Sequence, residues 1–183
     1  MSKGLELFSH CIVTHNVILF QGLGIYILLN YTKTLAEAFK AAVMMLATML
    51  TASTIMWAAE SALPISFGMR LPVILLIALL SGLLWHKLLA PYHKSSGSYN
   101  FLPIFVNSAL VGALLNTYQY DVSGVNIIGY GFFCALGYGL VLIIMAGIRQ
   151  RLELANVPKP LRGIPILLIS TGLLALALMG FRF

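Results

Sequence analysis

Polar side chains and glycines interrupt two long apolar stretches of this sequence. The first stretch contains Gln21, Gly22 and Gly24, and the second contains Asn107 and Gly112. Within a membrane, such residues weaken a continuous helix, and non-helical backbone persists there only where it is buried in protein or lines a cavity. Half-helices of this kind bind ions or substrates at the midplane of transporters. We therefore take these five residues as candidates for an ion path, although the glycines could instead serve only close helix packing.

Four other side chains are of types that could bind a metal or react. His10 and His15 lie in or near the first apolar stretch, but a spacing of five does not place them on one helical face, so we predict no metal pair and favour a neutral histidine bonded across a helix interface. Cys11 and Cys134 both lie within apolar stretches and form neither a disulfide framework nor a CxxC site. We expect both cysteines to pack as small apolar residues.

No motif of a soluble enzyme occurs in the sequence. It contains no Walker loop, no catalytic-triad spacing, no His-x-x-x-His pair and no flavin-attachment sequence. We therefore expect the chain to catalyse nothing by itself, and we assign no catalytic residue.

The composition is that of a membrane protein. The 183 residues are 60% hydrophobic and only 9% charged, with a mean hydropathy of +0.96, whereas soluble domains carry about 25% charged residues. The apolar residues come in runs of roughly 18–25, the length that a helix needs to cross a bilayer. The net charge of +6 comes from basic residues in short loops, which argues against a nucleic-acid partner.

We predict one all-α, polytopic integral-membrane domain over residues 1–183, with six transmembrane helices in contact with the lipid bilayer. No segment between the spans is long enough for a soluble domain, so any redox or nucleotide-binding domain must belong to another chain. The predicted spans are Leu5–Leu29, Leu35–Ala59, Leu71–Leu89, Phe101–Leu115, Val125–Gly147 and Ile164–Phe181.

The interrupted spans, the first and the fourth, occupy corresponding places in two sets of three spans. With an odd number of spans in each half, the halves lie in opposite orientations, as in inverted-repeat membrane proteins. We predict two inverted three-helix repeats, at about residues 1–95 and 96–183, with broken or half helices at spans 1 and 4.

Basic residues set the expected orientation, because cytoplasmic loops are enriched in Lys and Arg. Three of them, Lys3, Arg70 and Arg182, lie at the termini or in even loops. The other eight lie in or beside odd loops: Lys33, Lys40, Lys87, Lys94, Arg149, Arg151, Lys159 and Arg162. We predict a multi-pass protein of a bacterial or archaeal inner (cytoplasmic) membrane, with both termini outside.

Half of those eight residues lie in one segment, Ile148–Gly163. Pro158 and Pro160 stiffen this segment, and a preformed loop loses less entropy when it docks. The segment either only determines the orientation of the chain in the membrane or also docks an acidic cytoplasmic partner. The candidate docking residues are Arg149, Arg151, Lys159 and Arg162.

This segment also carries a resemblance to a known family. It reads R-Q-R-L from Arg149 and A-N-V-P-K-P-L-R-G from Ala155, and the last apolar span ends in Met179-Gly180-Phe181. The sequences F-L-P at 101–103, N-S-A-L-V-G at 107–112, Y-G-F at 130–132 and N-V-I-L-F-Q-G-L-G at 16–24 also fit. Together they resemble RnfA/NqrE-type membrane subunits of Rnf complexes and Na⁺-translocating NADH:quinone oxidoreductases (Nqr).

The resemblance implies a role in an ion-translocating electron-transport complex that moves Na⁺ or H⁺. It implies six spans in two inverted halves, an outward N-terminus, and a transmembrane core formed with a paralogous subunit of opposite topology. In the family, the two paralogues share a [2Fe–2S] cluster, each contributing one cysteine from its first span and one from its fourth. Flavins and other Fe–S centres lie in partner subunits.

The sequence departs from the family pattern at the expected ligand positions, where Tyr26 and Ser108 replace the cysteines. Phenol and hydroxyl oxygens are poor substitutes for the thiolates that hold Fe–S clusters. We therefore predict no cofactor bound by this chain, with a [2Fe–2S] cluster on unusual ligands as the alternative.

Two other functions stay open. A small inverted-repeat secondary transporter without a redox role would bind its substrate at the two interrupted spans. A purely structural assembly factor is the third possibility.

Overall fold

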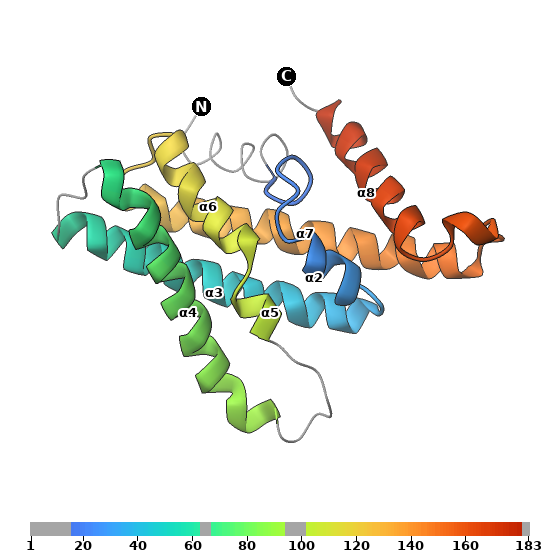
Figure 1. Ribbon diagram of the computed structural model, residues 1–183, viewed down its shortest axis with the longest axis horizontal. Coiled ribbons are helices and arrows are strands. Elements are labelled where there is room, and N and C mark those ends of the chain that lie inside the picture. The colour runs from blue at the N-terminus through green and yellow to red at the C-terminus, as the bar shows by residue number, and fades with distance from the viewer. Residues whose placement is uncertain (1–15, 63–66, 94–101, 181–183) are drawn as a thin grey trace.

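The computed structural model describes residues 16–62, 67–93 and 102–180, and all regular structure within these ranges is helical (Figure 1). Among the described residues, three helices are long and apolar enough to cross a membrane: α3 (Leu35–Ala62), α4 (Arg70–His93) and α7 (Asn126–Leu154). A shorter apolar helix, α8 (Ile164–Met179), ends the described chain. The prediction of an all-α polytopic membrane protein is confirmed.

Local sequence explains where these helices begin and end. At the start of α3, the hydroxyl of Thr34 accepts a hydrogen bond from the Glu37 amide over 3.2 Å, and Glu37 places a negative charge in the first turn. The 3-10 turn η2 (Phe67–Met69) leads directly into α4. Pro165 stands in the first turn of α8, where its missing N–H costs nothing.

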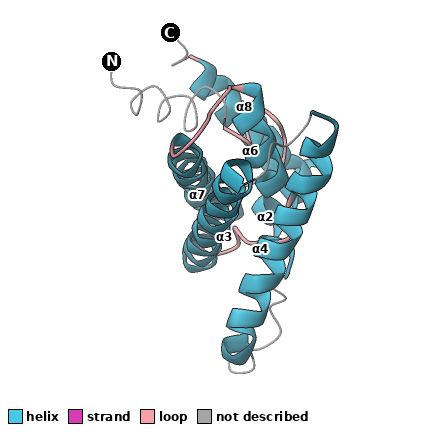
Figure 2. Ribbon diagram, turned by 90° about the vertical axis from the view of Figure 1, so that its left-hand side faces the viewer, coloured by secondary structure: helices cyan, strands magenta, loops and turns pink. Residues whose placement is uncertain are grey.

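Helices α3 and α7 form the centre of the fold and run antiparallel, side by side (Figures 1 and 2). Small residues bring their backbones close together: a Cβ added at Gly131 would collide with Ser53, and one added at Gly139 would lie 3.0 Å from the Cβ of Ala42. Close approach through small residues is how membrane helices pack without a hydrophobic driving force. In the predicted division, α3 is the second span of the first half and α7 the second span of the second half, and the inversion of the two halves stays a prediction.

Both spans predicted to be broken are broken. The fourth span consists of α5 (Leu102–Phe105) and α6 (Ser108–Gln119), which are separated at Val106 and Asn107. In the first span, residues 16–24 form turns, and the short helix α2 (Ile25–Asn30) follows them. The earlier part of that predicted span, with His10, Cys11 and His15, lies outside the described residues.

Helix α7 continues seven residues beyond the predicted end of its span at Gly147, to Leu154. Its last turns are composed of Arg, Gln, Leu and Glu, which are good helix formers, and the chain becomes extended at Ala155 before Pro158. Arg149 and Arg151 therefore lie on a helix, and only the 3-10 turn η3 (Lys159–Leu161) and its flanks form the connection to α8.

Candidate functional site

The two helix breaks meet inside the fold. The amide of Gly24, which precedes α2, donates a hydrogen bond to the hydroxyl of Ser108, the first residue of α6, over 3.0 Å. Gly24 adopts a left-handed conformation (φ 83°), which turns the chain into α2. Asn107 caps α6, since its side-chain oxygen accepts a hydrogen bond from the Ala109 amide over 3.1 Å. The N-terminal ends of α2 and α6 therefore lie next to each other.

Tyr138 of α7 ties the breaks to the central helix pair. Its hydroxyl donates to the carbonyl oxygen of Gly24 over 3.3 Å and accepts from the side-chain amide of Asn107 over 3.1 Å. The Tyr138 side chain is fully buried. A Cβ added at Gly24 would lie 2.7 Å from this hydroxyl, so the close approach requires glycine at that position.

A second polar contact joins the first interrupted span to α6, eight residues beyond Ser108. The side-chain amide of Gln21 donates to the side-chain oxygen of Asn116 over 2.9 Å. Asn116 is only 2% exposed, and its own side-chain nitrogen has no hydrogen-bond partner among the described residues. Gly112 makes room for this contact, because a Cβ there would collide with Leu23 and lie 3.3 Å from the side-chain oxygen of Gln21.

Asn16, the first described residue, joins the non-helical segment to α7. Its side-chain nitrogen donates to the carbonyl oxygen of Gly137 over 3.0 Å, and its side-chain oxygen accepts from the Ile18 amide over 3.1 Å. Asn16 is buried, as are Val17 and Ile18 beside it. Within the segment, the amides of Phe20 and Gly22 still donate to the carbonyl oxygens four residues earlier. Together with the contact to Gly137 of α7, these bonds give polar groups of the segment partners within the protein, as the membrane interior demands.

The structure therefore brings together four of the five proposed ion-path residues: Gln21, Gly24, Asn107 and Gly112. The fifth, Gly22, lies exposed in the same turn with φ 67°. Sequence reasoning missed Asn116 and Tyr138, which complete both contacts. Asn116 could have been found from the sequence, because it is a lone amide side chain in an apolar helix. The sequence gives no comparable indication for Tyr138.

The two side chains at the positions expected for cluster ligands lie at the surface. Tyr26 is 60% exposed and Ser108 is also exposed. Asn107 and Ser108 border a hollow of about 550 Å³ whose remaining wall is mostly apolar residues of α4, among them Leu75 and Leu79. The breaks are therefore accessible from the outer side of the bundle.

These side chains do not fit a [2Fe–2S] cluster. Neither offers a thiolate, and the Ser108 oxygen already accepts the Gly24 amide. The described cysteine, Cys134, is buried within α7, and the residues that the structure describes contain no group of three or more His, Cys, Asp or Glu side chains that could hold a metal.

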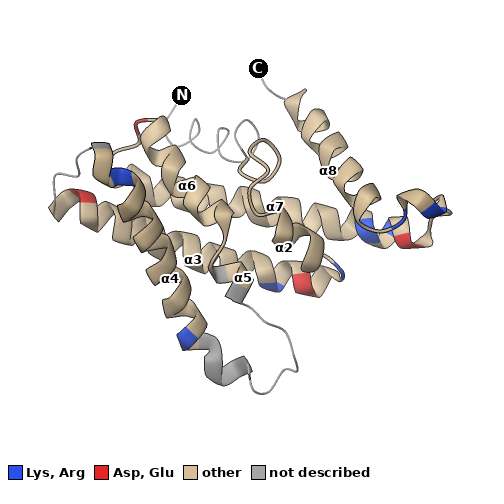
Figure 3. Ribbon diagram, in the orientation of Figure 1, with Lys and Arg blue, Asp and Glu red and all other residues tan. Residues whose placement is uncertain are grey.

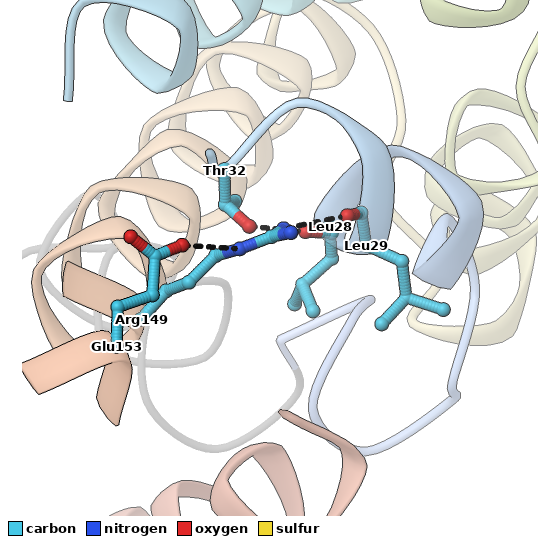
Figure 4. A network of polar contacts seen from close by, with 5 residues as sticks. All are labelled: Leu28, Leu29, Thr32, Arg149 and Glu153. Carbon is cyan, nitrogen blue, oxygen red and sulfur yellow. Dashed lines mark hydrogen bonds and ion pairs between the residues drawn. The ribbon is translucent and has the colours of Figure 1, made fainter. Parts of the chain in front are cut away.

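Lys and Arg positions occur at the end of α7 and in the connection to α8 (Figure 3). The four basic residues predicted to dock a partner differ in their contacts and exposure. Arg149, with a side chain 19% exposed, donates to the carbonyl oxygen of Leu29 at the end of α2 over 2.8 Å, and its Nε lies 3.7 Å from Glu153 (Figure 4). Arg151, Lys159 and Arg162 are exposed. A cation at the last carbonyls of a helix is favourable, so Arg149 stabilises α2 from its C-terminal end.

Known proteins resemble this chain along its whole length. A family model described as "Rnf-Nqr subunit, membrane protein" matches residues 4–183. The chain is 32% identical over 188 residues to the A-type subunit of the ion-translocating oxidoreductase complex of Edwardsiella ictaluri, covering 99% of this chain and 97% of that protein. Proteins of the same name from Yersinia enterocolitica and Yersinia pseudotuberculosis are 30% and 33% identical, with the same coverage.

Proposed function

The chain belongs to the Rnf-Nqr family of membrane subunits, and we propose from this membership that it is the A-type subunit of an ion-translocating oxidoreductase complex. The observation that carries the proposal is similarity along the whole chain to relatives that bear this subunit's name. The converging breaks at Gly24 and Ser108 supply the structural element for ion movement, because they place polar groups and free helix ends within the membrane.

The partner in the membrane is a paralogous subunit of opposite topology. The surface that would face it includes Tyr26, Ser108 and the hollow beside Asn107, where both short helices begin. A second subunit packed there would cover the exposed side of the breaks and exclude lipid from them. Non-helical backbone at this depth requires such cover.

The orientation puts the C-terminal end of α7 and the loop before α8 in the cytoplasm of a bacterial or archaeal cell, with both termini outside. The exposed charges of Arg151, Lys159 and Arg162 support this orientation through the positive-inside bias. Arg151 and Lys159 also provide an exposed basic surface on which an acidic cytoplasmic subunit docks. Flavins and other Fe–S centres belong to such partner subunits.

The chain itself contributes structure and an ion path rather than a redox centre. Gln21 and Asn116 present amide groups across the breaks, and the turn from residue 16 to residue 24 presents backbone carbonyls outside a regular helix. These groups can replace part of the water around a small cation as it passes. The alternative cofactor assignment, a [2Fe–2S] cluster shared with the paralogue, would need ligands other than Tyr26 and Ser108.

Coupled transport in membrane vesicles tests the proposal. Inverted vesicles from cells with and without the chain are given the electron donor of the complex, and uptake of Na⁺ and H⁺ is followed. We expect donor-driven ion uptake only when the chain is present, and co-purification of the tagged chain with flavin- and Fe–S-containing subunits. Solute uptake that needs no electron donor, with no co-purifying redox subunit, would instead establish the secondary-transporter alternative.

A further inference from the structure

A small crevice lies between the end of α7 and the beginning of α8. Its volume is about 200 Å³, and its lining includes Arg149, Glu153, Arg162 and the apolar side chains of Leu152, Ile166 and Leu167. Gly163, with φ 98°, turns the chain where the loop enters α8, and α8 leaves α7 at a steep angle (Figure 1). The crevice is the space enclosed where the two helices separate.

The charge of this crevice is positive and incompletely balanced. Two guanidinium groups face one carboxylate, that of Glu153, whose side chain is 65% exposed and lies 3.7 Å from Arg149. An exposed pair at this distance contributes little. The Arg162 side chain makes no hydrogen bond or ion pair within the part of the chain that the structure describes. Donor groups therefore remain available in the crevice.

The crevice also lies where a lipid headgroup would be. It sits at the ends of two apolar helices, and α8 continues from it with a largely exposed apolar surface that includes Leu173 and Leu176. Only Leu167 and Thr171 of α8 are buried. Positive charge at the helix end and an uncovered apolar helix below it together match the two parts of a phospholipid.

We propose that the crevice binds the phosphate of an anionic phospholipid, with the acyl chains along α8. The planar guanidinium groups of Arg149 and Arg162 suit the oxygens of a phosphate, which they bind in a bidentate manner. Basic pockets between transmembrane helices are known receptors for anionic headgroups. A carboxylate from a soluble partner would satisfy the charge but would leave the apolar surface of α8 uncovered.

The proposed lipid has a consequence for the helix breaks. Arg149 lines the crevice and also holds the last turn of α2 through Leu29. A bound phosphate replaces the weakly held Glu153 as the counter-ion of Arg149 and keeps its guanidinium in place. The lipid therefore supports α2 through Arg149.

Photo-crosslinking with a lipid probe tests the proposal. The complex that contains the full-length chain is placed in phosphatidylcholine vesicles carrying either photoactivatable phosphatidylglycerol or photoactivatable phosphatidylcholine, and the labelled peptides are identified by mass spectrometry. We expect phosphatidylglycerol to label the peptides around the crevice, at α7 and α8, about tenfold more than phosphatidylcholine. Both lipids carry a phosphodiester, but the choline cation of phosphatidylcholine cancels the net charge of its headgroup. The tenfold factor corresponds to a difference of about 1.4 kcal/mol in binding free energy.

Two variants and one control test the site. Arg162→Gln should lower the labelling roughly tenfold, because it removes the free guanidinium. Ile166→Trp should also lower it, by filling the apolar side of the crevice without changing the charge. Lys159→Gln, an exposed basic residue on the same loop that does not line the crevice, should leave labelling unchanged.

Four results would overturn the proposal. Equal labelling by both lipids would exclude recognition of an anionic headgroup. Equal loss in Arg162→Gln and Lys159→Gln would reduce the effect to general surface charge. Abolition of labelling by millimolar inorganic phosphate would identify a free anion as the occupant. Crosslinks from the crevice to an acidic protein of the complex, in place of lipid, would identify a protein partner.

Discussion

The amide of Gly24 donates a hydrogen bond to the hydroxyl of Ser108 over 3.0 Å, which joins two residues separated by 84 positions in the chain. One residue precedes α2 and the other begins α6. The bond therefore holds together the two interrupted spans, one from each half of the protein, at the point where each becomes helical. The candidate ion-path residues lie close together because the two interrupted spans meet at this point. Contacts between the spans should therefore stabilise the site.

Gly24→Ala should destabilise the protein through two separable effects. A left-handed conformation costs a non-glycine residue roughly 1–2 kcal/mol, and the clash of the new methyl group with Tyr138 adds about 1–3 kcal/mol. The matched control is Gly124→Ala, since Gly124 has φ 64° but nothing within 4 Å of an added Cβ. Thermal unfolding in detergent should show a larger loss for Gly24→Ala. Equal losses would mean that the contact with Tyr138 is not tight.

Gln21 and Asn116 should behave as a coupled pair. Gln21→Leu leaves the buried Asn116 without its partner, at a cost of about 1–3 kcal/mol. The double variant Gln21→Leu/Asn116→Leu removes both polar groups and should be more stable than Gln21→Leu alone, which a thermal-unfolding cycle of the four proteins measures. If these amides line the ion path, donor-driven ion uptake falls in the double variant although stability recovers. Normal ion uptake in the double variant would show that neither residue belongs to the ion path.

Arg149→Gln should loosen α2. The change removes the charged donor from the carbonyl oxygen of Leu29, a bond worth roughly 1.5–3 kcal/mol. Hydrogen-exchange mass spectrometry of the α2 peptide should show faster exchange. Arg151→Gln, two residues further along the same helix but exposed, is the control and should leave α2 unchanged. Similar exchange in the two variants would show that Arg149 does not support the half-helix.

The side chains at positions 26 and 108 should decide whether this chain can share a cluster. We expect the purified wild-type complex to show no cluster signal that depends on Tyr26 or Ser108, because neither supplies a thiolate. The variant Tyr26→Cys/Ser108→Cys should gain iron, acid-labile sulfide and an electron paramagnetic resonance signal on reduction. A signal already present in the wild type and lost in Tyr26→Phe or Ser108→Ala would contradict this prediction.

Sequence reasoning predicted the breaks because glycines and amides within an apolar span leave a local signature. Gly24 and Asn107 were recognised in this way, and the structure confirms a break at each. Sequence reasoning could not identify Tyr138, since a tyrosine in an apolar helix gives no indication of which neighbour it contacts. That depends on how α7 packs against both breaks.

Arg149 illustrates a second limit of sequence reasoning. A basic residue close to a loop indicates orientation, and its contact with Leu29, 120 positions away, follows only from the extension of α7 beyond its apolar part. The charge pattern gave a topological prediction for this residue, whereas its stabilising contact is a matter of three-dimensional geometry.

The tight seam between α3 and α7 limits how the protein can move. Gly131 lies against Ser53 and Gly139 against Ala42, so the longest helix of each half is in contact with its counterpart at nearly backbone distance. Rigid-body rocking of one half against the other, a common mode in inverted-repeat transporters, would have to pull this seam apart. A gating motion of the short elements α2, α5 and α6 would leave this contact intact, with α3 and α7 as a stationary frame.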